Sequence, residues 1–496
     1  MRFSNTDDAS GASQSASRSI RSEPLADGHG LFQGMQLRLS RLSLSVFLTL
    51  AVSALFGWHL LRAHAQAAAQ MGRPDVPFNY APINYSSDAR DPVAKLQERL
   101  IAGKAKLEYE PQYGYLRSAL KLLDVPIDSQ TLVFSKTSFQ YSKISPEHPR
   151  ALYFNDDVYV GRVHDGKGLE FVSFDPKQGA IFYLLDEHKA AHPSFKREDL
   201  DCTQCHVAAS TRGVPGLFLR SVYTADTGLP AGGKSYVTDQ ESPLKDRWGG
   251  WYVTGRFNGF NHMGNAVVDA KGTQKFDLVG LSKTFDKSDY LIPDSDIVAH
   301  LVLAHQTQMH NLITLTNYRT RIALYAQAQQ NKRAGLPEDA PLSDAARKQF
   351  ERPAEQLLRY MLFSNEAPLP GQLIASSSSY EKEFVARGPT DPKGRSLRDF
   401  DLKTGIFRYP CSYLIYSGSF DSIPEPAKEY VYHRLFEVLT GKDQSPDFVR
   451  LSGDDRKAIL EILLATKPGL PEEWRDYAKS NRIHVAANRS RPHPEG

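Results

Sequence analysis

One short segment of the sequence holds two thiols and an imidazole at a fixed spacing. Cys202, Cys205 and His206 stand in the order Cys-x-x-Cys-His, which is the pattern of c-type haem attachment. Thiols at positions i and i+3 lie on one helical turn, so both can add to the vinyl groups of one haem as thioethers. The adjacent imidazole is then held where it can bind the iron as an axial ligand. The segment therefore predicts one covalently attached haem c, with His206 on its iron.

Three other interpretations of this segment stay open beside the haem. A structural zinc site normally pairs Cys-x-x-Cys with a second pair of ligands, and Cys411 is the only other cysteine of the chain. A redox dithiol or disulfide of the thioredoxin type is expected at a strand-to-helix junction in a βαβ setting, which the flanking sequence lacks. The third interpretation is a chance match. We favour the haem, because exported chains with so few cysteines seldom place two of them in this pattern by accident.

The second axial ligand decides what such an iron can do. Iron with a second strong ligand carries electrons, whereas an open site permits small-molecule chemistry. Met263 is the first candidate, because glycines flank its loop and aromatic residues precede it, and its neighbour His262 is an alternate. The competing interpretation of Met263 is a methionine that fills a gap in the core. A second set of candidates lies on one predicted helix: His300, His305, Met309 and His310.

The motif resembles that of the c-type cytochromes, and the resemblance covers these five residues alone. It implies a protein that binds one haem c and transfers electrons to a redox partner protein. An ordinary single-haem cytochrome c domain is much shorter and wholly helical, whereas here the motif follows predicted strands in a chain of 496 residues. In this respect the chain is similar to large, mostly uncharacterised exported proteins with one such motif.

An alternative function follows if the iron has an open sixth position. The chain would then be a haem-dependent oxidoreductase of the peroxidase kind or a haem-based sensor. A dihaem peroxidase would need a second Cys-x-x-Cys-His motif, and the sequence has one. Whether the protein is an enzyme with its own substrate is therefore left open, with the electron carrier favoured.

The N-terminal part has the features of an export signal. Residues 1–34 are rich in Ser, Gly and Asp without hydrophobic periodicity, which predicts a disordered leader. Residues 35–65 hold basic residues, an apolar run over 42–61 and an Ala-x-Ala pattern that ends at Ala65. This order is typical of a secretory signal peptide, and the run is also long enough for a retained transmembrane anchor; a buried soluble helix is the third possibility. We expect a periplasmic or otherwise exported protein, either soluble or anchored to the inner membrane.

The rest of the chain predicts an α+β fold in two regions. Residues 66–92 contain several prolines and are expected to form a linker. Residues 93–293 form the strand-rich region with the haem motif, and 294–485 form a helical region before a disordered tail over 486–496. Apolar runs alternate with turn sequences in the first region, which predicts an antiparallel meander. Its strands are expected over 151–154, 158–163, 169–174 and 180–185, with further strands over 248–256, 265–268 and 276–281.

Helical spacing of apolar residues dominates the second region. Asp294 or Ser295 is expected to cap a long helix that ends near Gln330. Residues 364–398, with four consecutive serines and several prolines and glycines, predict a long surface loop. Further helices are expected over 93–104 and 115–123 in the first region and over 344–363, 427–441, 454–465 and 471–479 in the second.

Composition excludes several classes of protein. There are 60 Lys and Arg against 57 Asp and Glu, which gives a formal net charge of +3 without a long basic run. This balance argues against a nucleic-acid binder that works by bulk charge. Three cysteines are too few for a disulfide framework, and a hydrophobic fraction of 41% is enough to build a core, so the chain is not disordered throughout.

Overall fold

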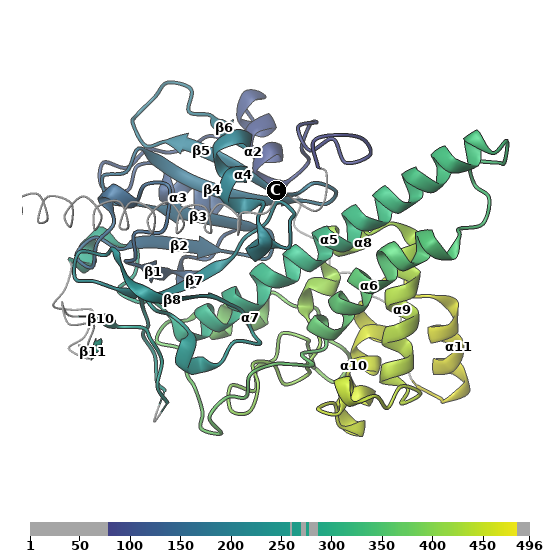
Figure 1. Ribbon diagram of the computed structural model, residues 1–496. Coiled ribbons are helices and arrows are strands. Elements are labelled where there is room, and N and C mark those ends of the chain that lie inside the picture. Colours follow the sequence, from purple (N-terminus) through teal and green to yellow (C-terminus); the bar gives the residue numbers. More distant parts are fainter. Residues whose placement is uncertain (1–77, 258–259, 269–273, 277–285, 484–496) are drawn as a thin grey trace, which may run out of the picture. The chain divides into compact units, whose positions relative to one another are not determined.

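The computed structural model of the protein describes residues 78–257, 260–268, 274–276 and 286–483. The predicted leader, the signal or anchor over 35–65 and the tail over 486–496 lie outside these residues. Among the described residues, no helix combines the length and the apolar character that crossing a bilayer requires. The described chain is α+β as predicted, with an antiparallel sheet in the first half and helices in the second (Figure 1).

A seven-stranded antiparallel sheet forms the first half, in the order β6-β5-β4-β3-β2-β1-β9. The predicted meander over 151–185 is confirmed, because four of these strands match its strands to within one residue at each end. The strands of the sheet are β1 (Thr131–Val133), β2 (Arg150–Phe154), β3 (Val158–Arg162), β4 (Gly168–Asp175), β5 (Gly179–Asp186), β6 (Phe195–Arg197) and β9 (Trp251–Tyr252).

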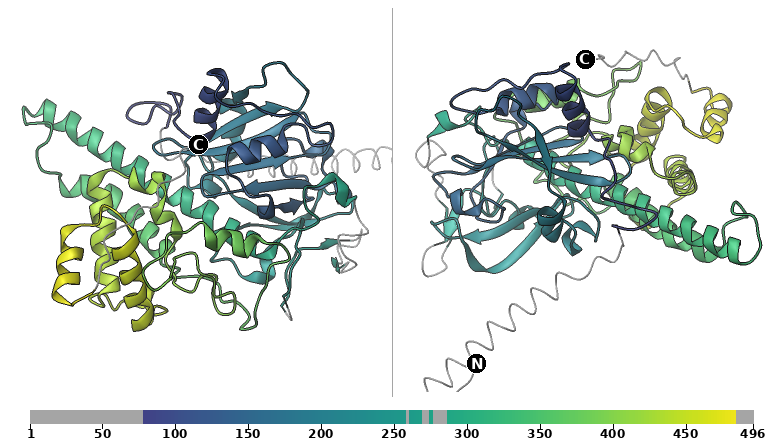
Figure 2. Two further views of the ribbon diagram at one scale, coloured as in Figure 1. Left: turned by 180° about the vertical axis from the view of Figure 1, so that it is seen from behind. Right: turned by 90° about the horizontal axis from the view of Figure 1, so that it is seen from above.

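Both faces of the sheet are buried, and successive side chains alternate between two cores. On β3, Tyr159 belongs to one core, while Val158 and Val160 belong to the other. One core contains α2 (Pro92–Ile101) and α3 (Leu116–Leu122), and the other contains most of the buried side of α5 (Ile297–Arg333). Figure 2 shows these helices on opposite faces of the sheet. Burial on both faces explains why β3 is apolar almost throughout.

Two hairpins accompany the sheet. β7 (Leu219–Thr224) pairs with β8 (Pro230–Thr238), and β10 (Ala266–Val268) pairs with β11 (Gln274–Phe276). The sequence did not predict the first hairpin. The strand predicted over 248–256 is shorter than expected, because only β9 within it joins the sheet, while Thr254 and Arg256 form isolated bridges to Asp296 and Ala375. Residues 277–281 lie outside the described chain.

The second half is helical as predicted. After α5 come α6 (Asp344–Met361), α7 (Tyr380–Ala386), α8 (Gly418–Asp421), α9 (Glu425–Leu439), α10 (Gly453–Thr466) and α11 (Glu472–Ser480). The loop predicted over 364–398 is wrong in part, because α7 lies within it. The short helix α8 was not predicted.

The N-cap of the long helix α5 lies two residues after one predicted cap, Asp294, and one residue after the other, Ser295. Asp296 is its N-cap, and one carboxylate oxygen accepts hydrogen bonds from the backbone N–H groups of Val298 at 2.8 Å and Ala299 at 3.2 Å. The other oxygen accepts from the backbone of Ser377 at 2.8 Å and Ser378 at 3.0 Å. The serine run therefore binds the start of α5 rather than forming a free surface loop.

Candidate haem-attachment site

The Cys-x-x-Cys-His segment forms α4 (Asp199–His206), a helix of eight residues that follows β6 at one edge of the sheet (Figure 1). Cys202 and Cys205 therefore stand three positions apart on one short helix. Arg197 of β6 fixes the start of this helix, since its Nε donates to the Asp199 carboxylate at 2.7 Å. The same guanidinium donates to the backbone oxygens of Ser87 at 2.8 Å and Tyr85 at 2.5 Å. Residues of the predicted linker thus brace the motif.

His206 is the last residue of α4, and aromatic rings enclose its imidazole. The ring centroids of Phe182 on β5 and Phe218 lie 5.0 Å and 5.7 Å away. The Nδ1 atom lies 2.9 Å from the backbone oxygen of Gly216. A carbonyl oxygen only accepts, so Nδ1 carries the proton and Nε2 keeps its lone pair. Burial lowers the pKa of His206, which favours the neutral form that a metal ligand requires.

Gly216 is held close to His206 by further bonds. Its backbone N–H donates to the His206 oxygen at 3.0 Å. The side chain of Asn311 on α5 then binds the next residue twice, through the Leu217 N–H at 3.1 Å and the Leu217 oxygen at 2.7 Å. A Cβ at position 216 would lie 2.0 Å from the Asn311 Oδ1, so the close approach requires glycine. The turn sequence Val214-Pro215-Gly216 was visible in the sequence, but its pairing with His206 was not.

The two thiols of α4 are free, and they differ in exposure. Cys205 is exposed, whereas Cys202 is partly buried. Burial, followed by nearby carboxylates of which Glu170 and Glu198 act most strongly, raises the pKa of Cys202 to about 12. Redox-active and metal-binding thiols need the opposite shift, because the thiolate is the reactive form. In the folded chain this environment disfavours the redox dithiol and the zinc thiolate, and it equally slows addition of the Cys202 sulfur to a haem vinyl group.

The outer surface of α4 is uncovered. Its residues are exposed or, like Cys202 and His206, partly buried, and Leu200 is 82% exposed. Leu200 lies on the side of α4 away from Cys202 and His206, whereas the exposed thiol of Cys205 can be approached from solvent. The two thiols and the free Nε2 of His206 are the donor set that a covalent haem requires.

Met263 and His262, the first candidates for the sixth ligand, lie in a loop that packs against β7. Met263 is 4% exposed, and its sulfur accepts a hydrogen bond from the Ser221 hydroxyl at 3.6 Å. The Nδ1 of His262 accepts from the Gly264 N–H at 3.0 Å. In the described part of the chain, His206 makes no ring contact or hydrogen bond with Met263 or His262.

The candidates on α5 are bound within the core. His305 uses both ring nitrogens, since Nδ1 donates to Gln240 Oε1 at 2.5 Å and Nε2 accepts from the Ser412 hydroxyl at 2.8 Å. Met309 is fully buried. The Nε2 atoms of His300 and His310 donate to the backbone oxygens of Tyr252 at 2.9 Å and of Asp156 at 2.7 Å. These bonds assign the set a structural role in positioning α5.

Buried histidines make the stability of the fold sensitive to acid. Burial lowers the pKa of His305 to about 3 and that of three others to about 4: His262, His300 and His310. In the unfolded chain a histidine titrates near pH 6.5. Below that pH the unfolded state binds protons that the folded state does not, so each group removes stability as the pH falls toward 4. Asp157 and Glu366 act in the opposite direction, because burial raises the pKa of each to about 7.

We therefore expect each of these four histidines to lower the free energy of unfolding by up to about 1.4 kcal/mol per pH unit between pH 6 and 4.5. Urea unfolding across this range measures the slope. Replacing His305 by glutamine should reduce the slope by about 1.4 kcal/mol per pH unit. Replacing His188, an exposed histidine, by alanine should leave it nearly unchanged. A slope that is the same in His305→Gln as in the wild type contradicts this prediction.

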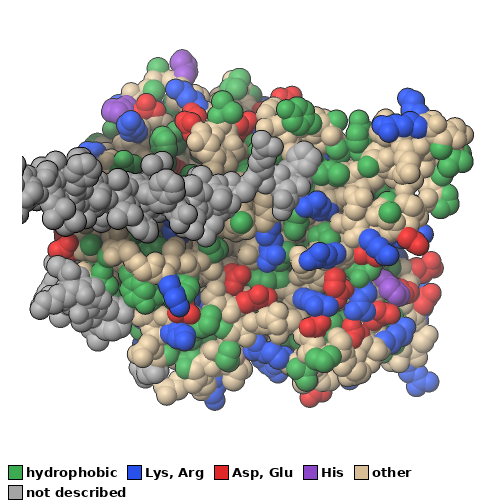
Figure 3. Space-filling model, in the orientation of Figure 1, with side chains coloured by type: hydrophobic (Ala, Val, Ile, Leu, Met, Phe, Trp, Pro, Cys, Tyr) green, Lys and Arg blue, Asp and Glu red, His purple; other side chains and the backbone are tan. Residues whose placement is uncertain are grey.

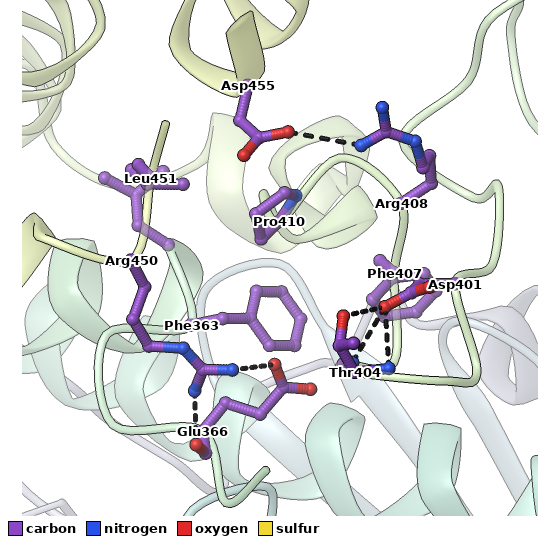
Figure 4. A pocket seen from close by; sticks show the side chains of 12 residues that line it. Phe363, Glu366, Asp401, Thr404, Phe407, Arg408, Pro410, Arg450, Leu451 and Asp455 are labelled. Atoms are coloured by element: carbon purple, nitrogen blue, oxygen red, sulfur yellow. Dashed lines mark hydrogen bonds and ion pairs between the residues drawn. The ribbon is translucent and has the colours of Figure 1, made fainter. Parts of the chain in front are cut away.

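A cavity of about 240 Å³ opens in the helical half (Figure 4). Its charged residues pair with one another, as Arg450 with Glu366 at 3.4 Å and Arg408 with Asp455 at 3.2 Å. No residue that lines it belongs to α4 or to the sheet. We assign it no part in haem binding.

No known protein family, curated protein or solved structure matches the chain at a significant level of similarity.

Proposed function

We propose that the protein is an exported c-type cytochrome that carries one covalent haem c at Cys202, Cys205 and His206 and transfers electrons. The observation that carries this proposal is the hydrogen bond from His206 Nδ1 to the Gly216 oxygen at 2.9 Å. It fixes the tautomer in which Nε2 is free for a metal, on a helix that also presents two thiols three positions apart. When bound, the haem supplies one-electron redox chemistry at its iron.

Residues around α4 would bind the group and tune it. Phe182 and Phe218 shield the His206 ring from water. Four carboxylates act on the Cys202 thiol, in decreasing order Glu170, Glu198, Asp201 and Asp199. Negative charge near the iron favours its oxidised, more positive state, so these residues would lower the reduction potential.

The proposed partner is a redox protein that gives or takes the electron. On the face in Figure 3, Lys and Arg side chains are interspersed with Asp and Glu over the helical half. A mixed surface of this kind supports contact with another protein better than contact with a polyanion, and we propose no nucleic-acid partner.

We also propose that the chain is exported, as its N-terminal sequence indicates. The apolar run over 42–61 would act as a cleaved signal or as a membrane anchor. Haem attachment of this type is completed outside the bacterial cytoplasm, so a periplasmic location agrees with the proposed cofactor.

A second candidate function has one observation in its favour. Met263 binds Ser221 and His305 binds two core residues, so neither has its donor atom free. If the sixth position of the iron stays open, the protein would be a haem-dependent oxidoreductase of the peroxidase kind or a haem-based sensor.

The spectrum of the oxidised protein separates the two functions. For the electron carrier with Met263 as sixth ligand, we expect low-spin iron with a weak near-infrared sulfur-to-iron band. Met263→Ala should remove this band, because it removes the thioether. The control is Met361→Ala, which truncates another buried methionine and should leave the band in place.

A high-spin wild-type protein whose spectrum does not change in Met263→Ala would contradict the electron carrier and favour the second candidate. A low-spin protein whose band is absent or survives the substitution would exclude Met263 alone. His262, then His305 and Met309, are the next residues to replace.

A further inference from the structure

Three donor side chains from separate segments meet beside the central strands of the sheet. His148 precedes β2, His164 lies between β3 and β4, and Asp289 ends a 3-10 turn (Lys287–Asp289) ahead of α5. One donor atom of each lies within 4.8 Å of the other two. The His164 Nδ1 is 3.7 Å from the Asp289 carboxylate, and the two imidazole rings are stacked with centroids 5.2 Å apart.

One of these donor atoms is buried without a hydrogen-bond partner. The Nδ1 of His164 is shielded from solvent and makes no hydrogen bond, because 3.7 Å to the Asp289 oxygen exceeds hydrogen-bond distance. An unsatisfied buried nitrogen costs about 1–3 kcal/mol. A cation between this nitrogen and the carboxylate would satisfy both groups.

The backbone holds the three segments together without any added ion. The Tyr290 hydroxyl donates to the Pro149 oxygen at 2.8 Å, which ties the residue after Asp289 to the residue after His148. The Arg162 guanidinium at the end of β3 donates to the backbone oxygen of Asp289 at 2.9 Å. These bonds fix the backbone of the three segments, so an ion would have to order only the three side chains.

We propose that His148, His164 and Asp289 form a binding site for Zn²⁺. Two imidazoles and one carboxylate are donors that Zn²⁺ accepts, whereas Ca²⁺ and Mg²⁺ prefer oxygen donors alone. Side-chain rotations that shorten the present separations would bring the donors to Zn–N and Zn–O distances of about 2.0–2.2 Å. His148 is exposed, so water can take the fourth position. The Asp165 carboxylate lies 3.8 Å from His164 Nε2, on the far side of that ring, where it can orient the imidazole.

This site is independent of the proposed haem. The experiment uses the full-length purified protein, freed of metal with a chelator and titrated with Zn²⁺ at pH 7.5 in competition with a chromophoric chelator. We expect one equivalent to bind, and the His148→Ala/His164→Ala double variant to weaken its binding by at least about 100-fold. Asp289→Asn, which keeps the size of the side chain, should weaken it as well. Zn²⁺ should also raise the thermal unfolding temperature of the wild type but not that of the double variant.

Two controls separate this site from other zinc ligands of the chain. His188→Ala removes an exposed histidine that lies 2.6 Å from Asp186. This variant should still bind one equivalent of Zn²⁺. Cys202→Ser/Cys205→Ser should retain it too. The proposal is overturned if the wild-type protein does not bind Zn²⁺. It is also overturned if His188→Ala weakens Zn²⁺ binding as much as the His148→Ala/His164→Ala double variant does. Loss in the cysteine variant alone also overturns it, and that outcome would place the metal on the thiols and count against the haem.

Discussion

Replacing Cys202 and Cys205 together by serine is expected to abolish all haem that survives denaturation. Serine is close to cysteine in size and should preserve the helix α4. It cannot form the thioethers that join the protein to the vinyl groups of the haem. The protein should be produced with export in a host that attaches haem c. Haem staining of a denaturing gel, with the oxidised and reduced absorption spectra, measures the attached haem.

Cys411→Ala is the matched control for this variant. Cys411 is a buried thiol outside the Cys-x-x-Cys-His segment, so its loss should leave the haem in place. Each single cysteine variant should keep at most one thioether, and its reduced spectrum should shift because one vinyl group stays unsaturated. Unchanged staining in the double variant would refute covalent attachment, and with it the proposed function.

Replacing Asp296 by alanine is expected to lower the free energy of unfolding by about 3–5 kcal/mol. The substitution removes the N-cap of α5, whose first turns lie in the core. It also leaves the backbone N–H groups of Ser377 and Ser378 without the carboxylate that binds them. This loss is a large part of the 5–15 kcal/mol that stabilises a typical domain. Urea unfolding of the variant and the wild type measures it.

Asp294→Ala is the control, because Asp294 is one of the two residues that the sequence predicted as a cap, and the structure uses neither as one. Its replacement should cost less than about 1 kcal/mol. The loss in free energy of unfolding for Asp296→Asn should lie between those of the two alanine variants, since the amide oxygen can still accept hydrogen bonds from the backbone of the helix. A similar loss in Asp294→Ala and Asp296→Ala would show that the capping arrangement is wrong.

The parts of the fold that were predicted depend on local sequence. The strands of the meander alternate with turn residues, and α5 and α6 repeat apolar residues at helical spacing, so each element is specified by its own residues. The hairpin of β7 and β8 lacks such a signal, because β8 is exposed along most of its length and contains two adjacent glycines. The helix α7 was missed because the serines before it were interpreted as a loop, whereas they bind Asp296 far away in the sequence.

The same distinction holds for the candidate site. The two thiols and His206 lie within five residues, so their spacing alone indicates their chemistry. The Gly216 oxygen, the Phe182 ring and the Asn311 side chain come from a turn, a strand and a distant helix. Only the folded chain brings them together, and the choice of a sixth ligand is a non-local question of the same kind.

β9 closes the sheet against β1, and Leu132 pairs with Tyr252 across about 120 residues of chain. The meander strands, by contrast, pair with their immediate neighbours in sequence. Contacts of short sequence separation close small loops at low entropic cost and form early, whereas the pairing of β9 must close a long loop. Cys202 and Cys205 lie inside that loop. The helix α4 that carries them follows β6 at the opposite edge of the sheet, so we expect this segment to fold with the meander, before β9 pairs.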